Sequence, residues 1–198
     1  MTRHGIAAMR PTGQGPPLAD AIGVPPVLII LAGLPGSGKT TLARGLCREL
    51  GAAHVRIDTI EQAMINSSEL VRVGVAGYGV GYAVAGDQLD VGVSVVADSA
   101  NLIEPTRAAW RAVAQSRRLE FRQIEVVCSD PALHRQRAES RISDITGHHN
   151  PSWQHIVERD AETAMGFTRV DAATHTVAEL VAIVRGVLPA AGPWLPLR

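Results

Sequence analysis

The stretch of sequence that decides the fold is GLPGSGKT, residues Gly33–Thr40. It follows an uninterrupted apolar run, Val27–Ala32, and leads into Thr41–Leu50, where leucine recurs at every fourth position. The apolar run predicts a strand buried on both faces, and the leucine spacing predicts a helix with one apolar face. Glycines let the backbone N–H groups of the loop point toward a bound phosphate, and the N-terminus of the following helix adds partial positive charge. The pattern G-x-x-x-x-G-K-[ST] in this context predicts a loop that binds the phosphates of a nucleoside triphosphate.

Two residues of this phosphate loop (Gly33–Thr40) have side chains suited to a triphosphate. Lys39 can reach the β- and γ-phosphates, and the Thr40 hydroxyl can bind Mg²⁺. Lys39 is the only lysine of the chain, so the N-K-x-D pattern of guanine recognition is absent and ATP is the expected nucleotide. The residues expected to bind it are Gly33, Leu34, Pro35, Gly36, Ser37, Gly38, Lys39, Thr40 and Thr41.

Composition and charge narrow the range of partners. The 198 residues include 19 basic and 19 acidic residues, so no overall field attracts nucleic acid or a membrane surface. Cys47 and Cys128 lack the spacing of a metal site, which predicts free thiols in a reducing compartment. No apolar run is long enough to cross a bilayer. We expect a cytoplasmic protein with a small-molecule partner, for which a homodimer is one possible assembly.

The length predicts one α/β domain. We expect a flexible leader rich in proline and glycine over residues 1–26, a folded domain over 27–188 with a lid around 131–150, and an irregular tail over 189–198. Strands and helices alternate along the domain, which predicts a parallel sheet with helices on both faces. The expected strands are Val27–Ala32, Ala53–Asp58, Val93–Asp98, Gln123–Cys128 and Phe167–Asp171.

Three helical segments are less plainly marked. Asp130 is a good cap and precedes proline, which predicts a helix from Pro131 to about Ser143. A further helix is expected over about Ser152–Met165. Glycines between Gly74 and Gly92 weaken a helix before Tyr82, so we expect a helix there only over about Tyr82–Val91.

Two acids end predicted strands on the edge of the sheet that holds the phosphate loop. In open α/β sheets, ligands bind at the carboxyl ends of the strands. Asp58 suits a base that orients an acceptor hydroxyl and takes its proton, and Asp98 suits an acid that holds Mg²⁺. The two roles could be exchanged, and the alternative for each acid is that it only caps a helix.

Arg137 and Arg141 lie four residues apart on the predicted helix after strand four, so they share one face. An arginine pair that closes over ATP would offset the charge of the transferring phosphoryl group. The alternative is a solvated helix face in which these arginines pair with Glu139 or Asp144.

The loop after strand three carries two further candidates, Asn101 and Arg107. Both could face the acceptor, and Arg107 lies near a helix start where an anion is favoured. The alternative is that they brace the loop. The adjacent His148 and His149 suggest a metal site, but no third ligand stands at a suitable spacing.

Together these motifs resemble the small P-loop kinases, and within them the AAA-type ATP-dependent kinases, a group similar to chloramphenicol phosphotransferase, polynucleotide 5′-kinase domains, zeta-toxin kinases and gluconate kinase. The resemblance covers about Val27–Val187. It implies a P-loop NTPase fold with five parallel strands in the order 2-3-1-4-5, ATP with Mg²⁺, and transfer of the γ-phosphate to a hydroxyl. It also matches Asp58 to the acid that activates the acceptor, and Arg137 and Arg141 to the lid arginines.

The resemblance leaves the acceptor open. We expect a small hydroxylated metabolite or an antibiotic-like compound. A polynucleotide 5′-hydroxyl is less favoured, because Ser99-Ala100 stands where polynucleotide kinases more often have threonine before the asparagine. The alternative from another class is a nucleotide-dependent switch or ATPase with no small-molecule acceptor.

Overall fold

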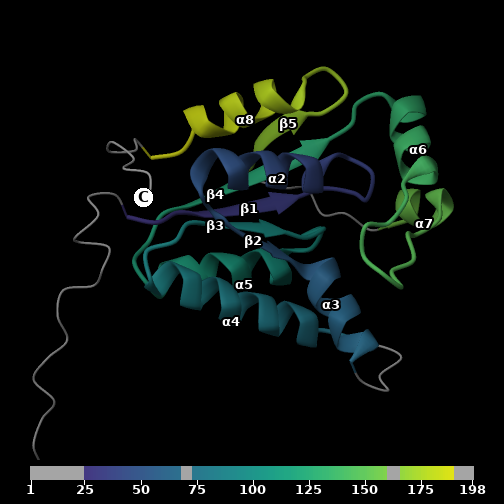
Figure 1. Cartoon of the computed structure of the whole chain (residues 1–198). Helices are drawn as coiled ribbons and strands as arrows, with labels where there is room; N and C mark the ends of the chain where they lie inside the picture. The colour runs from purple at the N-terminus through teal and green to yellow at the C-terminus, as the bar shows by residue number, and fades with distance from the viewer. Residues whose placement is uncertain (1–24, 68–72, 160–165, 190–198) are drawn as a thin grey trace, which may run out of the picture.

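A five-stranded parallel sheet in the order β2-β3-β1-β4-β5 forms the centre of the protein (Figure 1), which confirms the expected fold class and strand order. The computed structural model describes residues 25–67, 73–159 and 166–189. The strands are β1 (Leu28–Ala32), β2 (Ala53–Arg56), β3 (Val95–Asp98), β4 (Phe121–Val127) and β5 (Thr168–Asp171).

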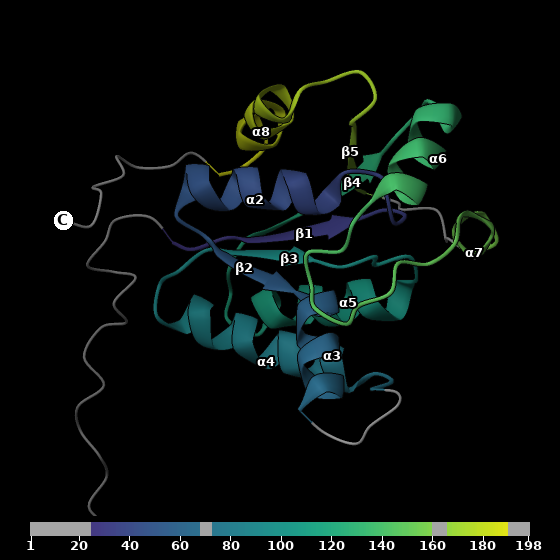
Figure 2. The same cartoon turned by 45° about the vertical axis from the view of Figure 1, so that its right-hand side comes forward.

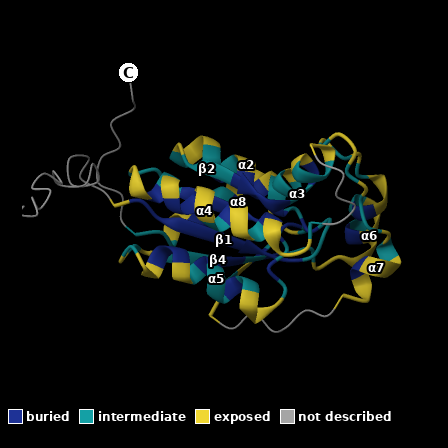
Figure 3. Ribbon diagram, turned by 90° about the horizontal axis from the view of Figure 1, so that it is seen from below, coloured by how far each residue is buried: buried dark blue, intermediate teal, exposed yellow. Residues whose placement is uncertain are grey.

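Helices cover both faces of the sheet and the edge at which its strands end. Two pairs pack on the faces: α2 (Lys39–Leu50) with α8 (Val177–Gly186), and α4 (Ala76–Asp90) with α5 (Glu104–Gln115). Three further helices, α3 (Ile57–Asn66), α6 (Pro131–Ser140) and α7 (Trp153–Val157), lie toward the carboxyl ends of the strands (Figures 1 and 2). Figure 3 shows the central strand β1 in the colour of buried residues, and every residue of β1 is buried between the two helical layers.

The glycine-rich stretch forms one helix, α4, which begins at Ala76 rather than at Tyr82 as expected. Its glycines permit close packing on α3: a Cβ added at Gly77 would lie 2.4 Å from the Glu61 Cγ, and one at Gly81 would lie 2.4 Å from the Ile57 Cδ1. A glycine costs a helix about 1 kcal/mol relative to alanine. Here that cost is offset by the close approach of two helices, which no local pattern reveals.

Two other predicted boundaries are wrong by a few residues. β2 ends at Arg56, and Asp58 lies in the first turn of α3 instead of ending the strand. An acid in the first turn is favoured by the helix dipole, which explains the early start. The cap at Asp130 is confirmed, since its carboxylate accepts the backbone N–H groups of Ala132 and Leu133, but α6 ends at Ser140 rather than near Ser143.

Several expectations fall wholly or partly outside the described residues. The leader before residue 25 and the tail after residue 189 lie outside them, as does the part of the helix predicted over Ser152–Met165 that follows residue 159. Within the described part of that segment, α7 spans only Trp153–Val157. Both cysteines are free and partly buried. Among the helices of the described residues, none is long and apolar enough to span a bilayer.

We expect Gly33→Ala to destabilise the protein by at least about 2 kcal/mol, because Gly33 has a φ of 138° and an added Cβ would lie 2.2 Å from the Val126 carbonyl oxygen. Gly79→Ala on α4 is the matched control, since nothing lies within 4 Å of the added Cβ. That variant should raise the free energy of unfolding by up to about 1 kcal/mol. Urea denaturation measures both, and equal effects would contradict this account of Gly33.

Candidate active site

The phosphate loop joins β1 to α2 and presents backbone N–H groups at the carboxyl edge of the sheet. Gly36 and Gly38 have φ values of 82° and 102°, in the region open to glycine, and the Ser37 N–H donates to the Leu34 carbonyl at 3.2 Å. α2 begins at Lys39, and no side chain of the described residues caps it at Gly38. The N–H groups of its first turn are therefore available to an anion.

Lys39 lies at the centre of this loop and is buried, with its side chain 9% exposed. Its Nζ donates a hydrogen bond to the Leu34 carbonyl at 2.8 Å. Burial lowers the pKa of Lys39 to about 8, although the negative charges of Asp98 and Asp58 oppose that shift. The amine therefore lies within the electrostatic range of both strand-end acids.

This pKa predicts that nucleotide binding weakens at alkaline pH. Above pH 8 the Lys39 amine of the nucleotide-free protein is largely neutral, whereas bound phosphates favour its charged form. Binding then takes up a proton, and the affinity should fall by up to about tenfold per pH unit above that point. Calorimetric titration of AMPPNP between pH 7 and 9.5, in buffers of different ionisation enthalpy, measures the proton uptake. A flat affinity over this range would contradict the prediction.

Asp98 lies at the end of β3, opposite Leu31 of β1, and only 3% of it is exposed. His54 Nε2 donates to its Oδ2 at 3.1 Å. Burial alone would raise the pKa of Asp98, but the hydrogen bond from His54, the charge of Lys39 and the contact with the Thr40 side chain together lower it. Asp98 is thus held as a carboxylate beside the Thr40 hydroxyl.

These two oxygen donors fit Mg²⁺, which proteins often bind through one or two side chains together with substrate phosphates and water. Within the described ranges, no cluster of three or more His, Cys, Asp or Glu side chains could hold a metal by protein ligands alone. Thr40 and Asp98 therefore suit a metal ion that binds together with a nucleotide. The expected metal ligands, Thr40 and Asp98, are brought together.

Asp58 lies half-buried in the first turn of α3, within the electrostatic range of Lys39. Two groups missed at the sequence level lie near it. Burial raises the pKa of Glu61, and the Asp58 charge adds to the effect. Burial is also the main cause that raises the pKa of Tyr78 of α4, with the charges of Glu61 and Asp58 adding to it and contacts with Ser99 opposing it. Asp58 thus lies near partly buried titratable side chains of α3 and α4.

Asn101 and Arg107 make the contacts that are expected if these residues brace the loop after β3. Asn101 is 1% exposed with a φ of 47°, and its Nδ2 donates to the Leu31 carbonyl at 2.6 Å. Arg107 is buried, donates to Glu104 Oε2 at 3.2 Å and lies 5.8 Å from the Phe167 ring centre. Asn101 holds the β3–α5 loop against β1, and Arg107 joins that loop to α5 through the Leu102 carbonyl. Direct contact of either residue with an acceptor stays a prediction.

Arg137 and Arg141 line a cavity of about 550 Å³ that runs from the phosphate loop to the loop between β5 and α8. Arg137 Nη1 donates to the Ala172 carbonyl at 3.0 Å. Arg141 lies beyond the end of α6 in extended backbone, so the two do not share one helix face, yet they reach the same cavity. A second hollow, lined by residues such as Phe121 and Thr168 at the starts of β4 and β5, lies away from the phosphate loop.

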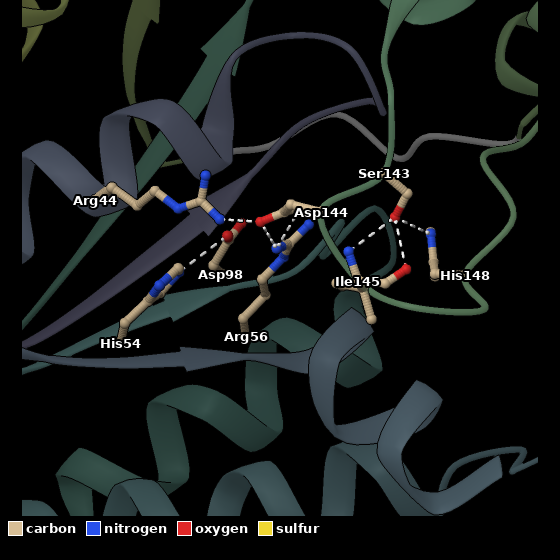
Figure 4. A network of polar contacts seen from close by, with 8 residues as sticks. All are labelled: Arg44, His54, Arg56, Asp98, Ser143, Asp144, Ile145 and His148. Atoms are coloured by element: carbon tan, nitrogen blue, oxygen red, sulfur yellow. Dashed lines mark hydrogen bonds and ion pairs between the residues drawn. The ribbon is translucent and has the colours of Figure 1, made fainter. Parts of the chain in front are cut away.

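The ion pairs proposed in the alternative interpretation of these arginines are not formed, because the two acids pair elsewhere. Glu139 accepts from Arg135 at 2.9 Å, and Asp144 pairs with Arg44 of α2 and Arg56 of β2 (Figure 4). Burial would raise the pKa of Asp144, but these two guanidinium groups outweigh it and lower the pKa well below its usual range. Asp144 thus anchors the segment after α6 across the edge of the sheet.

α6 contacts the phosphate loop through a hydrogen bond and close backbone packing. His134 Nε2 donates to the Pro35 carbonyl at 2.9 Å, and the His134 ring packs edge-to-face on Trp153 of α7. The backbone of Ala138 lies close to Gly36, where an added Cβ would be 3.2 Å from the Ala138 Cα. The segment expected to form a lid (residues 131–150) therefore lies against the loop through α6.

Comparisons with known proteins agree with this geometry. The sequence model of a family described as AAA domain (AAA_33) matches residues 28–162. The chain belongs to this AAA domain family. The matched range contains the phosphate loop, Asp58, Asp98 and the segment 131–150 of the AAA domain. No curated protein matches the chain.

Solved structures share the fold of this AAA domain at low sequence identity. A Chloroflexus aurantiacus protein is 22% identical, with 83% of this chain and 100% of that chain covered and a TM-score of 0.67. The APS kinase CysC of Mycobacterium tuberculosis, in complex with AMPPNP and APS, is 19% identical over 81% and 96% with a TM-score of 0.61. Kti12 of Chaetomium thermophilum, in complex with ADP-AlF3, is 20% identical over 82% and 100% with a TM-score of 0.61. The fold is that of the P-loop kinases.

Proposed function

We propose that this AAA domain is an ATP-dependent phosphotransferase that moves the γ-phosphate of Mg-ATP to a hydroxyl of a small molecule. The observation that carries the proposal is the position of Lys39. This residue is buried in the phosphate loop and interacts electrostatically with both Asp98 and Asp58. A phosphate-binding amine, a metal-binding acid and a candidate base thus meet at one edge of the sheet.

The donor half of the site would bind and orient the triphosphate. N–H groups of the phosphate loop and the Lys39 amine would hold the β- and γ-phosphates, while Thr40 and Asp98 would hold Mg²⁺. When bound, Mg²⁺ would neutralise charge on the phosphate oxygens. The cavity from the phosphate loop past Arg137 to Ala172 and His175 offers room for the rest of the nucleotide.

The acceptor half would place a hydroxyl in line with the γ-phosphate. Its oxygen forms a bond to the γ-phosphorus as the bond to the bridging oxygen breaks, and that electron pair leaves with ADP. Asp58 would orient the hydroxyl and accept its proton. Arg137 and Arg141 would stabilise the charge spread over the transferring group.

The structural neighbours support nucleotide binding by this fold. One was solved with AMPPNP and APS, and another with ADP-AlF3. The balanced charge of 19 basic and 19 acidic residues supports a small acceptor over a polynucleotide. We therefore place the acceptor among small hydroxylated metabolites or antibiotic-like compounds, for a protein of the cytoplasm.

An acceptor screen tests this function. The protein is incubated with Mg-ATP and a library of hydroxylated metabolites, and products are identified by mass spectrometry. A product heavier by one phosphoryl group supports the proposal. Slow ATP hydrolysis that no acceptor changes would favour a switch or ATPase, and labelling of a short oligonucleotide at its 5′-hydroxyl would favour a polynucleotide kinase.

A further inference from the structure

Arg56 is a buried arginine that uses only part of its hydrogen-bonding capacity. It is the last residue of β2, and 6% of it is exposed. Its Nη1 donates to both carboxylate oxygens of Asp144 at 3.0 Å. Its Nε and Nη2 are buried and have no hydrogen-bond partner among the described residues. Leaving charged donors buried without a partner is costly, so this arrangement calls for a ligand.

The two unpaired donors lie on the same edge of the guanidinium plane. Nε–H and Nη2–H project in parallel, at the spacing of two oxygens of a carboxylate, phosphate or sulfate. Such a fork binds an oxyanion with two charge-assisted hydrogen bonds. The pairing of Nη1 with Asp144 fixes the guanidinium and leaves the hydrogen-bonding capacity of this buried edge unused.

The position of Arg56 places this edge at the reaction centre of the proposed function. Arg56 is in register with Asp98, the proposed metal-binding acid, and stands two residues before Asp58, the proposed base. Side chains two apart on a strand share a face, so Arg56 lies on the same face as His54, which contacts Asp98. Figure 4 shows Arg56 rising from the end of β2 toward Asp144, close to Arg44 and Asp98.

The charge around Arg56 also favours an anion. Asp144 contacts both Arg44 and Arg56, so one carboxylate faces two guanidinium groups. Asp98 is already occupied by His54, Lys39 and Thr40. Arg44 and Arg56 together thus carry one positive charge more than the carboxylate between them.

We propose that the Nε–Nη2 edge of Arg56 is an oxyanion subsite of the active site. The oxyanion is either the γ-phosphate of the nucleotide or an anionic group of the acceptor, such as a carboxylate, sulfate or phosphate. This inference rests on the proposed function and adds a second binding point beside the phosphate loop. If the acceptor supplies the anion, the substrate class narrows to hydroxylated acids and to phosphorylated or sulfated alcohols.

Three calorimetric titrations with Mg²⁺ present distinguish the two sources in the wild type and in Arg56→Met. AMPPNP and ADP are titrated into the nucleotide-free protein, and inorganic sulfate into the protein saturated with AMPPNP. If the γ-phosphate binds Arg56, the variant weakens AMPPNP by about 10- to 100-fold and leaves ADP unchanged. If an acceptor anion binds there, both nucleotides bind as in the wild type, and sulfate binding falls by a similar factor.

Asp144→Asn is the matched control, because it alters the same contact but leaves the free edge of Arg56 in place. Asp144→Asn should bind AMPPNP and sulfate with wild-type affinity, including whichever of the two Arg56→Met binds more weakly. Arg56→Lys retains a positive charge without the fork, so it should behave like Arg56→Met and serves if that variant does not fold. Unchanged titrations in both Arg56 variants, or an equal loss in Asp144→Asn, would overturn the subsite. If wild-type protein does not bind AMPPNP at all, the proposed function itself fails.

Discussion

Replacing Asp58 by asparagine is expected to abolish phosphoryl transfer while nucleotide binding stays intact. Asparagine keeps the size of the side chain but cannot take the proton of the acceptor hydroxyl. Positioned general bases contribute about 10²- to 10⁴-fold to a rate, so kcat should fall by that factor. Steady-state kinetics with an acceptor from the screen, together with AMPPNP titration, measure the two effects separately.

Asp90→Asn is the control for this variant, because Asp90 is an exposed acid at the end of α4 that pairs with Arg117. It should leave both kcat and nucleotide affinity unchanged. Full transfer activity in Asp58→Asn would remove the assignment of the base. If Asp98→Asn instead loses transfer and keeps nucleotide binding, the two acids have exchanged roles.

The second large effect is expected from Lys39→Ala, which should lose nucleotide affinity and turnover together. The Lys39 amine is the buried cation of the phosphate loop, and its removal takes away the charged donor that this loop offers to the β- and γ-phosphates. Removal of one preorganised donor to a developing charge typically costs about 10²- to 10³-fold in rate. AMPPNP titration and initial rates measure the two losses.

Arg48→Ala, an exposed cation in the last turn of the same helix, is the comparison for Lys39→Ala. It should bind AMPPNP as the wild type does. Wild-type affinity in Lys39→Ala would show that the triphosphate does not bind in the phosphate loop, and the donor half of the site would have to be placed elsewhere.

Features encoded in short stretches of sequence could be predicted. The phosphate loop and the cap at Asp130 depend on neighbouring residues only, and the structure confirms the cap. The alternation of strands and helices predicted a parallel sheet, and the resemblance to P-loop kinases supplied the strand order that the structure shows. Asp98 at the end of β3 and Asp58 just after β2 were found because strand ends share one edge of such a sheet.

Features that depend on contacts between distant segments could not be predicted. Gly77 and Gly81 let α4 pack closely on α3. The low helix propensity of these glycines therefore led to a wrong prediction of where the helix begins. Glu61 and Tyr78 join Asp58 only through that packing. Arg56 was missed, since its pairing with Asp144 involves a segment 88 residues later. The alternation of His54 and Arg56 before Asp58 is the one local hint that was available.

The central claim is that this AAA domain transfers a phosphoryl group rather than only hydrolysing ATP. A single-turnover reaction with γ-labelled ATP, Mg²⁺ and an acceptor from the screen tests it most directly, because the label is followed from donor to product. The account predicts that label appears on the acceptor in step with ADP, and that Asp58→Asn stops both. Label released only as inorganic phosphate, at a rate that neither the acceptor nor Asp58→Asn changes, would contradict it.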